Sequence, residues 1–445
     1  MEAPPFWLRR MIILSLSHIS INGKMRPRRE SGSVLAVRRA GLLMKRALLS
    51  LLVLLILSVA MSPAEASPAC PKPADAVRKL VKEKEAAVNS GNQKRFLRVI
   101  HPERRTYLRE QKRWFEDAVR YIDPGSFRME VESVSPERPF RLRARIKQSY
   151  RKDGKTYSVK YFLRFEKTEQ GWKDSDLAFE RMAAGDVIVF YTDPRLKRQA
   201  AVALDIVGRA VDAFHEKYSW VPAEAVEVKL YHHPELFRQS VKLSLPEWAA
   251  GWNEAGQAIK FVGALQMEDW EESFASGLVH EVTHKMVSER TGDNAAYWLQ
   301  EGAAEYYQSR LLPGLFSASD EQRIDRPWRF AVLESLQLEK LPVKEASQYY
   351  AQSAALFRFL TERYGEEKMG EVFAVLRKYP TIDRDSADKI PELNRRTRAA
   401  FKKVLGKTME QLEREWISEY REGTSRGEGV PVSKKLAIIS GLTAP

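Results

Sequence analysis

Cysteine is almost absent from this chain, and long apolar runs are missing as well. Cys70 is the single cysteine among 445 residues, which excludes an internal disulfide. Lipidation is the alternative use of such a thiol, but Ser67-Pro68-Ala69 before it lacks the expected aliphatic residue. The longest apolar run, residues 47–61, has 15 residues, fewer than the roughly 20 that span a bilayer. Stability must therefore come from a buried apolar core.

Beyond residue 66, neither positive nor negative charge is in large excess. The formal net charge is +14, which by itself would be compatible with binding to nucleic acid. However, residues 1–66 hold ten Lys/Arg and only three Asp/Glu, and the remaining residues hold 63 basic and 56 acidic side chains. The hydrophobic content of 44% and the charged content of 30% are typical of soluble globular proteins. We therefore expect no nucleic-acid partner.

The segment MKRALLSLLVLLILSVAMSPAEAS, residues 44–67, has the pattern of a secretory signal. Two basic residues follow Met44, the apolar run comes next, and Ala64-Glu65-Ala66 forms an A-x-A cleavage site. This predicts a signal peptide at 44–66 and an exported bacterial protein, periplasmic or secreted, that begins at Ser67. If the signal were not cleaved, it would anchor the chain in the membrane. No other contact with a membrane is predicted. Residues 1–43 are then expected to be a spurious extension upstream of Met44.

Residues 67–182 predict an accessory α+β domain. Amphipathic helical segments occupy 72–122, and alternating apolar and polar residues follow in RMEVESV, RPFRLRARIKQSY and TYSVKYFLRFEK. Asp153-Gly154 between the last two is a hairpin turn signal. The order of these elements and the Gly171-Trp172 pair resemble the cone-shaped SnoaL-like, nuclear-transport-factor-like fold. One strand carries a basic row, which we interpret as a solvated face rather than a grip for an acidic polymer; it comprises Arg141, Arg143, Arg145 and Lys147.

Residues 183–425 predict a second domain, with a small sheet and a mostly helical C-terminal half, so that the whole chain belongs to the α+β class. The patterns predict strands at 186–192, 226–232 and 256–263, a helix at 195–219, and further helices at 270–290, 295–311, 345–362, 367–378 and 394–420. The tail, 426–445, has no strong pattern. His232 and His233 at a strand end are interpreted as loop residues, with a substrate-facing pair as the alternative.

The stretch HEVTH matches the metal-binding pattern H-E-x-x-H. At 3.6 residues per turn, His280 and His284 share one face of a helix, so both imidazoles can bind one ion. Glu281 lies about 100° around the same helix, near the ion but not necessarily bound to it. A catalytic zinc ion has three protein ligands plus water, so a third ligand is needed.

The next predicted helix carries WLQEGAAEYYQ, in which Glu301 and Glu305 again lie on one face. One of these carboxylates can complete the metal site, and the other can accept a hydrogen bond from a ligand imidazole. The alternative pattern of the metzincins requires Gly at position 287 and His at position 290, where this chain has Val287 and Arg290.

With these paired motifs, residues 186–375 resemble the gluzincin zinc metallopeptidases, and in particular the bacterial peptidase-MA-like proteins related to thermolysin and aminopeptidase N. The resemblance implies zinc bound by His280, His284 and Glu301, with Glu305 supporting a ligand histidine and Glu281 as the general base. Sixteen residues separate His284 from Glu301, slightly fewer than in aminopeptidase N relatives. Aminopeptidases also have a motif that binds the free amine of the substrate. The segment VGALQMEDW, 262–270, does not match that motif, and we treat it as a loop.

A tyrosine that begins a later helix stabilises the oxyanion in the aminopeptidase N group. Tyr350 in SQYYAQSAALF aligns best with it, and Tyr349 is the alternative; both could instead be core aromatics. GQAIKFVG, 256–263, is a candidate edge strand for pairing with an extended peptide.

Two functions from different classes follow from these motifs. The first is an exported zinc-dependent peptidase that hydrolyses a peptide or protein substrate. The second is a non-catalytic envelope binding protein with a metal-bound, peptidase-like fold. Glu281 favours the peptidase, because a purely structural metal site does not require a base beside it.

Overall fold

The computed structural model describes residues 72–245, 249–263, 270–315, 324, 326–383, 386 and 388–425. The chain divides into Met1–Cys70 and Pro71–Pro445, and the account below concerns the second unit. The expected extension, the signal peptide, Cys70 and the tail at 426–445 all lie outside the described residues. Among the described helices, none is both long enough and apolar enough to cross a bilayer.

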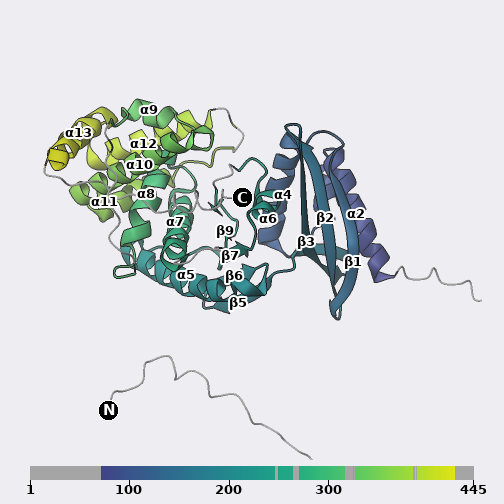
Figure 1. Ribbon diagram of the computed structural model, residues 1–445. Coiled ribbons are helices and arrows are strands. Elements are labelled where there is room, and N and C mark those ends of the chain that lie inside the picture. The colour runs from purple at the N-terminus through teal and green to yellow at the C-terminus, as the bar shows by residue number, and fades with distance from the viewer. Residues whose placement is uncertain are drawn as a thin grey trace, which may run out of the picture. The chain divides into compact units, whose positions relative to one another are not determined.

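The first sheet is antiparallel throughout and has the strand order β1-β2-β3-β4. Its strands are β1 (Arg128–Arg138), β2 (Arg141–Lys152), β3 (Lys155–Thr168) and β4 (Gly171–Leu177). Asp153 and Gly154 both have positive φ, 51° and 74°, as the two-residue turn between β2 and β3 requires. Within the described residues, three helices precede the sheet: α2 (Pro73–Asn89), α3 (Gln93–Leu97) and α4 (Arg105–Tyr121) (Figure 1).

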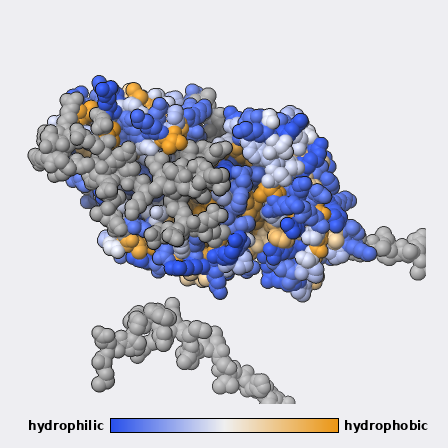
Figure 2. Space-filling model, viewed as in Figure 1, coloured by the Kyte–Doolittle hydropathy of each residue, from blue (hydrophilic) through white to orange (hydrophobic). Residues whose placement is uncertain are grey.

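The two faces of this sheet differ as the alternating sequence predicts. Ala144, Ile146 and Phe165 are buried in a core with residues of the helices. On the other face Arg141 pairs with Glu166, Arg145 lies 3.1 Å from Glu132, and the Arg143 guanidinium lies 4.0 Å from the centre of the Phe162 ring. Arg145 is exposed, whereas Arg141, Arg143 and Lys147 are half-buried, so the row is a solvated face only in part. Figure 2 shows a mainly hydrophilic surface where residues are coloured.

The second sheet is mixed and has the strand order β5-β6-β7-β9-β8. Its strands are β5 (Glu180–Ala184), β6 (Val187–Tyr191), β7 (Val226–Tyr231), β8 (Gly251–Trp252) and β9 (Ile259–Val262). β6, β7 and β9 are parallel, whereas β5 and β8 are antiparallel edge strands. The prediction that GQAIKFVG forms the edge was therefore wrong, because the two residues of β8 pair with β9 and take that position.

Two helices follow strands of this sheet directly. α5 (Lys197–Tyr218) joins β6 to β7, and α6 (Pro234–Val241) follows β7. His233 is the N-cap of α6 and its side chain accepts a hydrogen bond from the backbone N–H of Glu235. His232 lies 2.7 Å from the Thr192 hydroxyl. Both histidines therefore lie in the loop between β7 and α6, as predicted, whereas the helix α6 itself was not predicted.

The C-terminal half of the described chain is helical. It contains α7 (Trp270–Thr291), α8 (Tyr297–Arg310), α9 (Phe330–Ser335), α10 (Val343–Tyr364), α11 (Glu366–Leu376), α12 (Lys389–Leu405) and α13 (Met409–Ser425). The prediction of one helix over 394–420 was wrong, because Gly406 has φ 70° and ends α12 in a left-handed conformation. α8 and α10 pack closely at Gly302, where an added Cβ would collide with the Ser353 carbonyl oxygen.

Together these elements confirm the α+β class: an antiparallel sheet with helices, then a small mixed sheet and a mostly helical half (Figure 1). The change of sheet falls between Leu177 and Glu180, next to the predicted boundary at 182/183. However, the core of the first sheet also includes Leu236 and Phe237 of α6. The two predicted domains therefore share one apolar core at this point.

Candidate metal centre

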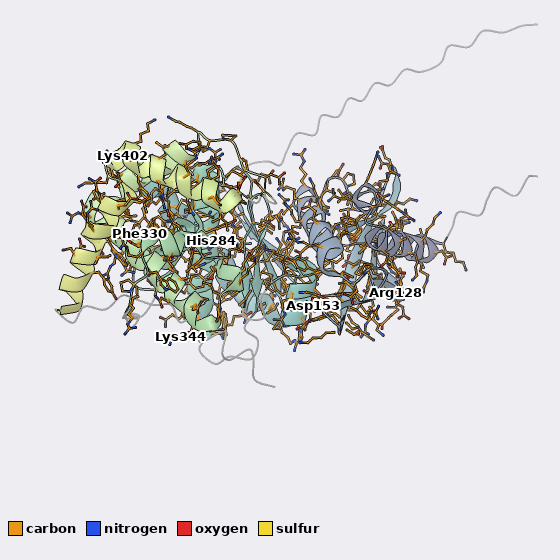
Figure 3. All side chains as sticks on the ribbon, turned by 90° about the horizontal axis from the view of Figure 1, so that it is seen from above. Arg128, Asp153, His284, Phe330, Lys344 and Lys402 are labelled. Carbon is orange, nitrogen blue, oxygen red and sulfur yellow. The ribbon has the colours of Figure 1, made fainter. Side chains whose placement is uncertain are left out.

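The centre lies between two consecutive helices, α7 and α8. A short turn joins them, and Gly292 and Asp293 in it both have positive φ, which reverses the chain and sets the two helices side by side. His280 and His284 project from one face of α7, and Glu301 projects from α8. His284 lies among the helices in Figure 3, whereas Lys402 and Lys344 lie toward the edge.

Each of these three side chains places one potential ligand atom close to those of the other two. The Nε2 atoms of His280 and His284 lie 3.0 Å apart. Glu301 Oε2 lies 3.5 Å from the first and 3.3 Å from the second. His280 is only 1% exposed, and the other two side chains are partly buried. The three predicted ligands therefore form a group that could hold a metal ion.

The donor set fits a cation. Glu301 Oε2 is buried and makes no hydrogen bond of good geometry within the described structure, because its polar neighbours are the two imidazole nitrogens at 3.3 Å and 3.5 Å. A buried carboxylate oxygen without a donor is costly, and an ion between the three side chains would remove that cost. Burial raises the pKa of Glu301, but His284 and His280 lower it more strongly, so that the pKa lies well below its usual value. This lowering requires protonated imidazoles, and a bound cation would supply the positive charge in their place, so the carboxylate would be ionised in either case.

Glu305 lies one helical turn beyond Glu301 and contacts the other nitrogen of His280. Its Oε1 atom is 3.2 Å from His280 Nδ1, and its Oε2 atom accepts a 2.6 Å hydrogen bond from Gln308. A carboxylate in this position can accept the Nδ1–H, which would fix the imidazole tautomer and leave Nε2 available for a metal. Sequence reasoning did not identify Gln308, although its spacing of three residues from Glu305 on a helix was a usable signal.

Glu281 is buried, at 3% exposure, and is not one of the three converging ligands. Its carboxylate lies against Gly251 in β8, where an added Cβ would collide with it. The glycine thus allows the edge strand to approach the carboxylate. The sequence analysis did not single out Gly251, because a two-residue strand leaves almost no periodic signal.

The two tyrosines at the start of α10 have different environments. The Tyr350 ring lies 6.3 Å from the His280 ring, centre to centre, whereas Tyr349 is 1% exposed within the helical core. Burial raises the pKa of Tyr350 well above its usual value, and the charges of Glu301, Glu305 and Glu281 raise it further. The phenol therefore keeps its proton at neutral pH and can donate a hydrogen bond toward the site.

Comparisons with known proteins give little independent information. No protein-family model and no curated protein matches the chain. Among solved structures, an NTF2-like protein of unknown function from Shewanella oneidensis matches 23% of this chain and 95% of its own, with 14% identity and a TM-score of 0.21. This likeness carries no argument about the fold or the metal centre.

Proposed function

We propose that this protein is an exported zinc-dependent peptidase. The observation that carries the proposal is the convergence of His280, His284 and Glu301 on one point. A tetrahedral zinc ion with bonds of about 2.0–2.1 Å separates its ligand atoms by roughly 3.3–3.4 Å. The three separations here are 3.0, 3.3 and 3.5 Å, so the ligand atoms need to move by only a few tenths of an ångström to fit.

The donor types favour zinc over harder cations. Two imidazoles and one carboxylate form a set typical of catalytic zinc sites, whereas calcium and magnesium select oxygen ligands. Three protein ligands also leave one position of a tetrahedral ion for water. When bound, zinc would supply Lewis acidity, which makes water acidic at neutral pH and polarises a peptide carbonyl.

The protein's own residues supply the remaining steps. Glu281 would accept the proton of the attacking water and deliver it to the leaving amine. Tyr350 would donate its O–H to the carbonyl oxygen as negative charge develops there. The edge strand β8 lies against Glu281, and an extended peptide could pair with its backbone. The substrate would therefore be a peptide or an unfolded protein segment.

The proposal is tested with purified protein and unfolded casein. We expect about one zinc ion per chain and cleavage that a chelator stops and added zinc restores. Elemental analysis gives the stoichiometry, and gel electrophoresis or mass spectrometry follows the cleavage. Bound zinc without cleavage of casein or of a varied peptide mixture would instead support the non-catalytic envelope binding protein. Absence of metal would contradict both functions.

A further inference from the structure

Helix α4 of the N-terminal part contacts the segment that leads to the edge strand. Trp114 Nε1 donates a 2.8 Å hydrogen bond to the carbonyl oxygen of Gln239 in α6. Asp117 accepts hydrogen bonds of 3.0 Å from both the backbone N–H and the hydroxyl of Ser244. These contacts fix α6 and the chain that follows it against α4, which lies beside α6 in Figure 1.

One carboxylate of the same helix reaches the second sheet. Glu110 is 7% exposed and its Oε2 atom lies 2.6 Å from Lys229 Nζ in β7. Its Oε1 atom lies 3.2 Å from Lys260 Nζ in β9 and accepts a 3.2 Å hydrogen bond from the Ala258 backbone N–H. Glu110 therefore contacts β7, β9 and the turn that enters β9.

The neighbouring residue, Arg109, contacts the same turn. Its guanidinium donates to the Gly256 carbonyl oxygen and lies 2.7 Å from Glu224. Lys260 in turn donates a 2.6 Å hydrogen bond to Gln257. The turn between β8 and β9 is thus attached to α4 through several charged groups, and hydrogen bonds to charged groups are the stronger kind.

The β8–β9 hairpin connects these contacts with the metal centre. Gly251 pairs with Phe261 and Trp252 pairs with Lys260, so a shift of β9 moves β8 as well. Gly251 also lies against the Glu281 carboxylate. A peptide that pairs with the backbone of β8 would be placed by this hairpin, so the position of the hairpin matters for substrate binding.

We propose that Glu110 is a positioning residue: together with Arg109 it holds the β8–β9 hairpin so that the edge strand presents a peptide to Glu281. The role of the peptide rests on the proposed peptidase function, whereas the support of the hairpin does not. The N-terminal part would then be a component of the substrate site rather than a separate binding module. The long sequence separation explains why no local pattern indicates this role.

The test uses Glu110→Gln in the full chain. Gln keeps the size of the side chain and can still accept from Ala258, but it removes the charge that Lys229 and Lys260 contact. We expect amide hydrogen exchange in residues 251–263 to accelerate about ten- to a hundredfold. The KM for a quenched fluorescent peptide of casein sequence should rise about tenfold, with a smaller change in kcat. Zinc content should stay unchanged.

Glu137→Gln is the matched control. Glu137 is a partly buried carboxylate of the same N-terminal part, in β1, and it accepts hydrogen bonds of 2.7 Å and 2.8 Å from the Arg164 guanidinium; these contacts include neither α4 nor the hairpin. This variant should lose thermal stability while its KM and the exchange of residues 251–263 remain near those of the wild type. If Glu110→Gln does not fold, Arg109→Ala, at a more exposed position, tests the same turn and should accelerate the same amides.

The proposal would be overturned if amide exchange and KM in Glu110→Gln stayed at their wild-type values. Equal changes in Glu137→Gln would overturn it as well. If the wild type hydrolyses no peptide, the proposed peptidase function fails. The exchange measurement still decides whether Glu110 holds the hairpin, so the two failures are distinguishable.

Discussion

Two largely buried polar clusters of the protein differ in composition. The cluster between α7 and α8 combines two imidazoles with the carboxylates of Glu301 and Glu305. The cluster between α4 and the second sheet combines Glu110 and Asp176 with Lys229 and Lys260. The second cluster contains its own counter-charges, whereas the first leaves Glu301 Oε2 without a hydrogen bond of good geometry.

This difference indicates a candidate binding site in the first cluster and a structural ion-pair network in the second. Buried charges are tolerated when they are paired and hydrogen-bonded, and the lysines fulfil that condition for the second cluster. In the first cluster, neutral imidazoles can present nitrogen lone pairs but no full positive charge. We therefore propose that an external cation completes the first cluster, whereas the second contains its own counter-charges.

The largest expected effect is loss of the metal. His284→Ala removes one of three ligands, so we expect most zinc to be lost and hydrolysis with it. Elemental analysis after dialysis measures the zinc content. His215→Ala is a control, because it removes a histidine in α5 that is not part of the ligand group. Undiminished zinc in His284→Ala would contradict the assignment of the site.

The second cluster should respond in stability rather than in metal content. Lys229→Met leaves Glu110 and Asp176 buried with less positive charge, and breaking a buried pair in this way costs about 3–5 kcal/mol. Urea denaturation measures the loss. Lys82→Met, which removes an exposed lysine 3.1 Å from Glu85, should cost less than about 1 kcal/mol. Equal, small effects would show that the cluster is not a tightly coupled network.

The smallest effect concerns pH. Burial raises the pKa of Asp176 to about 6, above its usual value of 3.8, so the folded state binds this proton more tightly than the unfolded chain. Its contribution to stability therefore decreases as pH rises from about 4 to 6 and is constant above that range. Between about pH 4 and 6 the urea midpoint of the wild type should fall relative to that of Asp176→Asn, because Asn does not titrate. Parallel pH profiles would contradict the raised pKa.

The metal-ligand cluster could be predicted from the sequence, whereas the cluster around Glu110 could not. His280, His284, Glu301 and Glu305 lie on two consecutive helices, and helical spacing alone indicates which side chains share a face. The turn between the helices is short, so their faces meet. The fold class could be predicted for a similar reason, because each long helix and strand has its own period.

The contacts of α4 could not be predicted in this way. Glu110 and Ala258 are 148 positions apart, and no local period relates them. The edge strand β8 was missed because it has two residues, and α6 was missed because it is only eight residues long. The split between α12 and α13 was missed because one glycine, Gly406, interrupts an otherwise helical pattern. Tertiary pairing and single-residue conformations decide these features.

The central claim is that the metal ligands and the general base are different residues of one site. A paired measurement of zinc stoichiometry and peptide hydrolysis for Glu281→Gln and Glu301→Gln tests it most directly. We predict that Glu281→Gln keeps about one zinc ion per chain and loses about 10²–10⁴-fold in rate, whereas Glu301→Gln binds zinc more weakly. Full hydrolysis in Glu281→Gln, or unchanged zinc affinity in Glu301→Gln, would contradict the account.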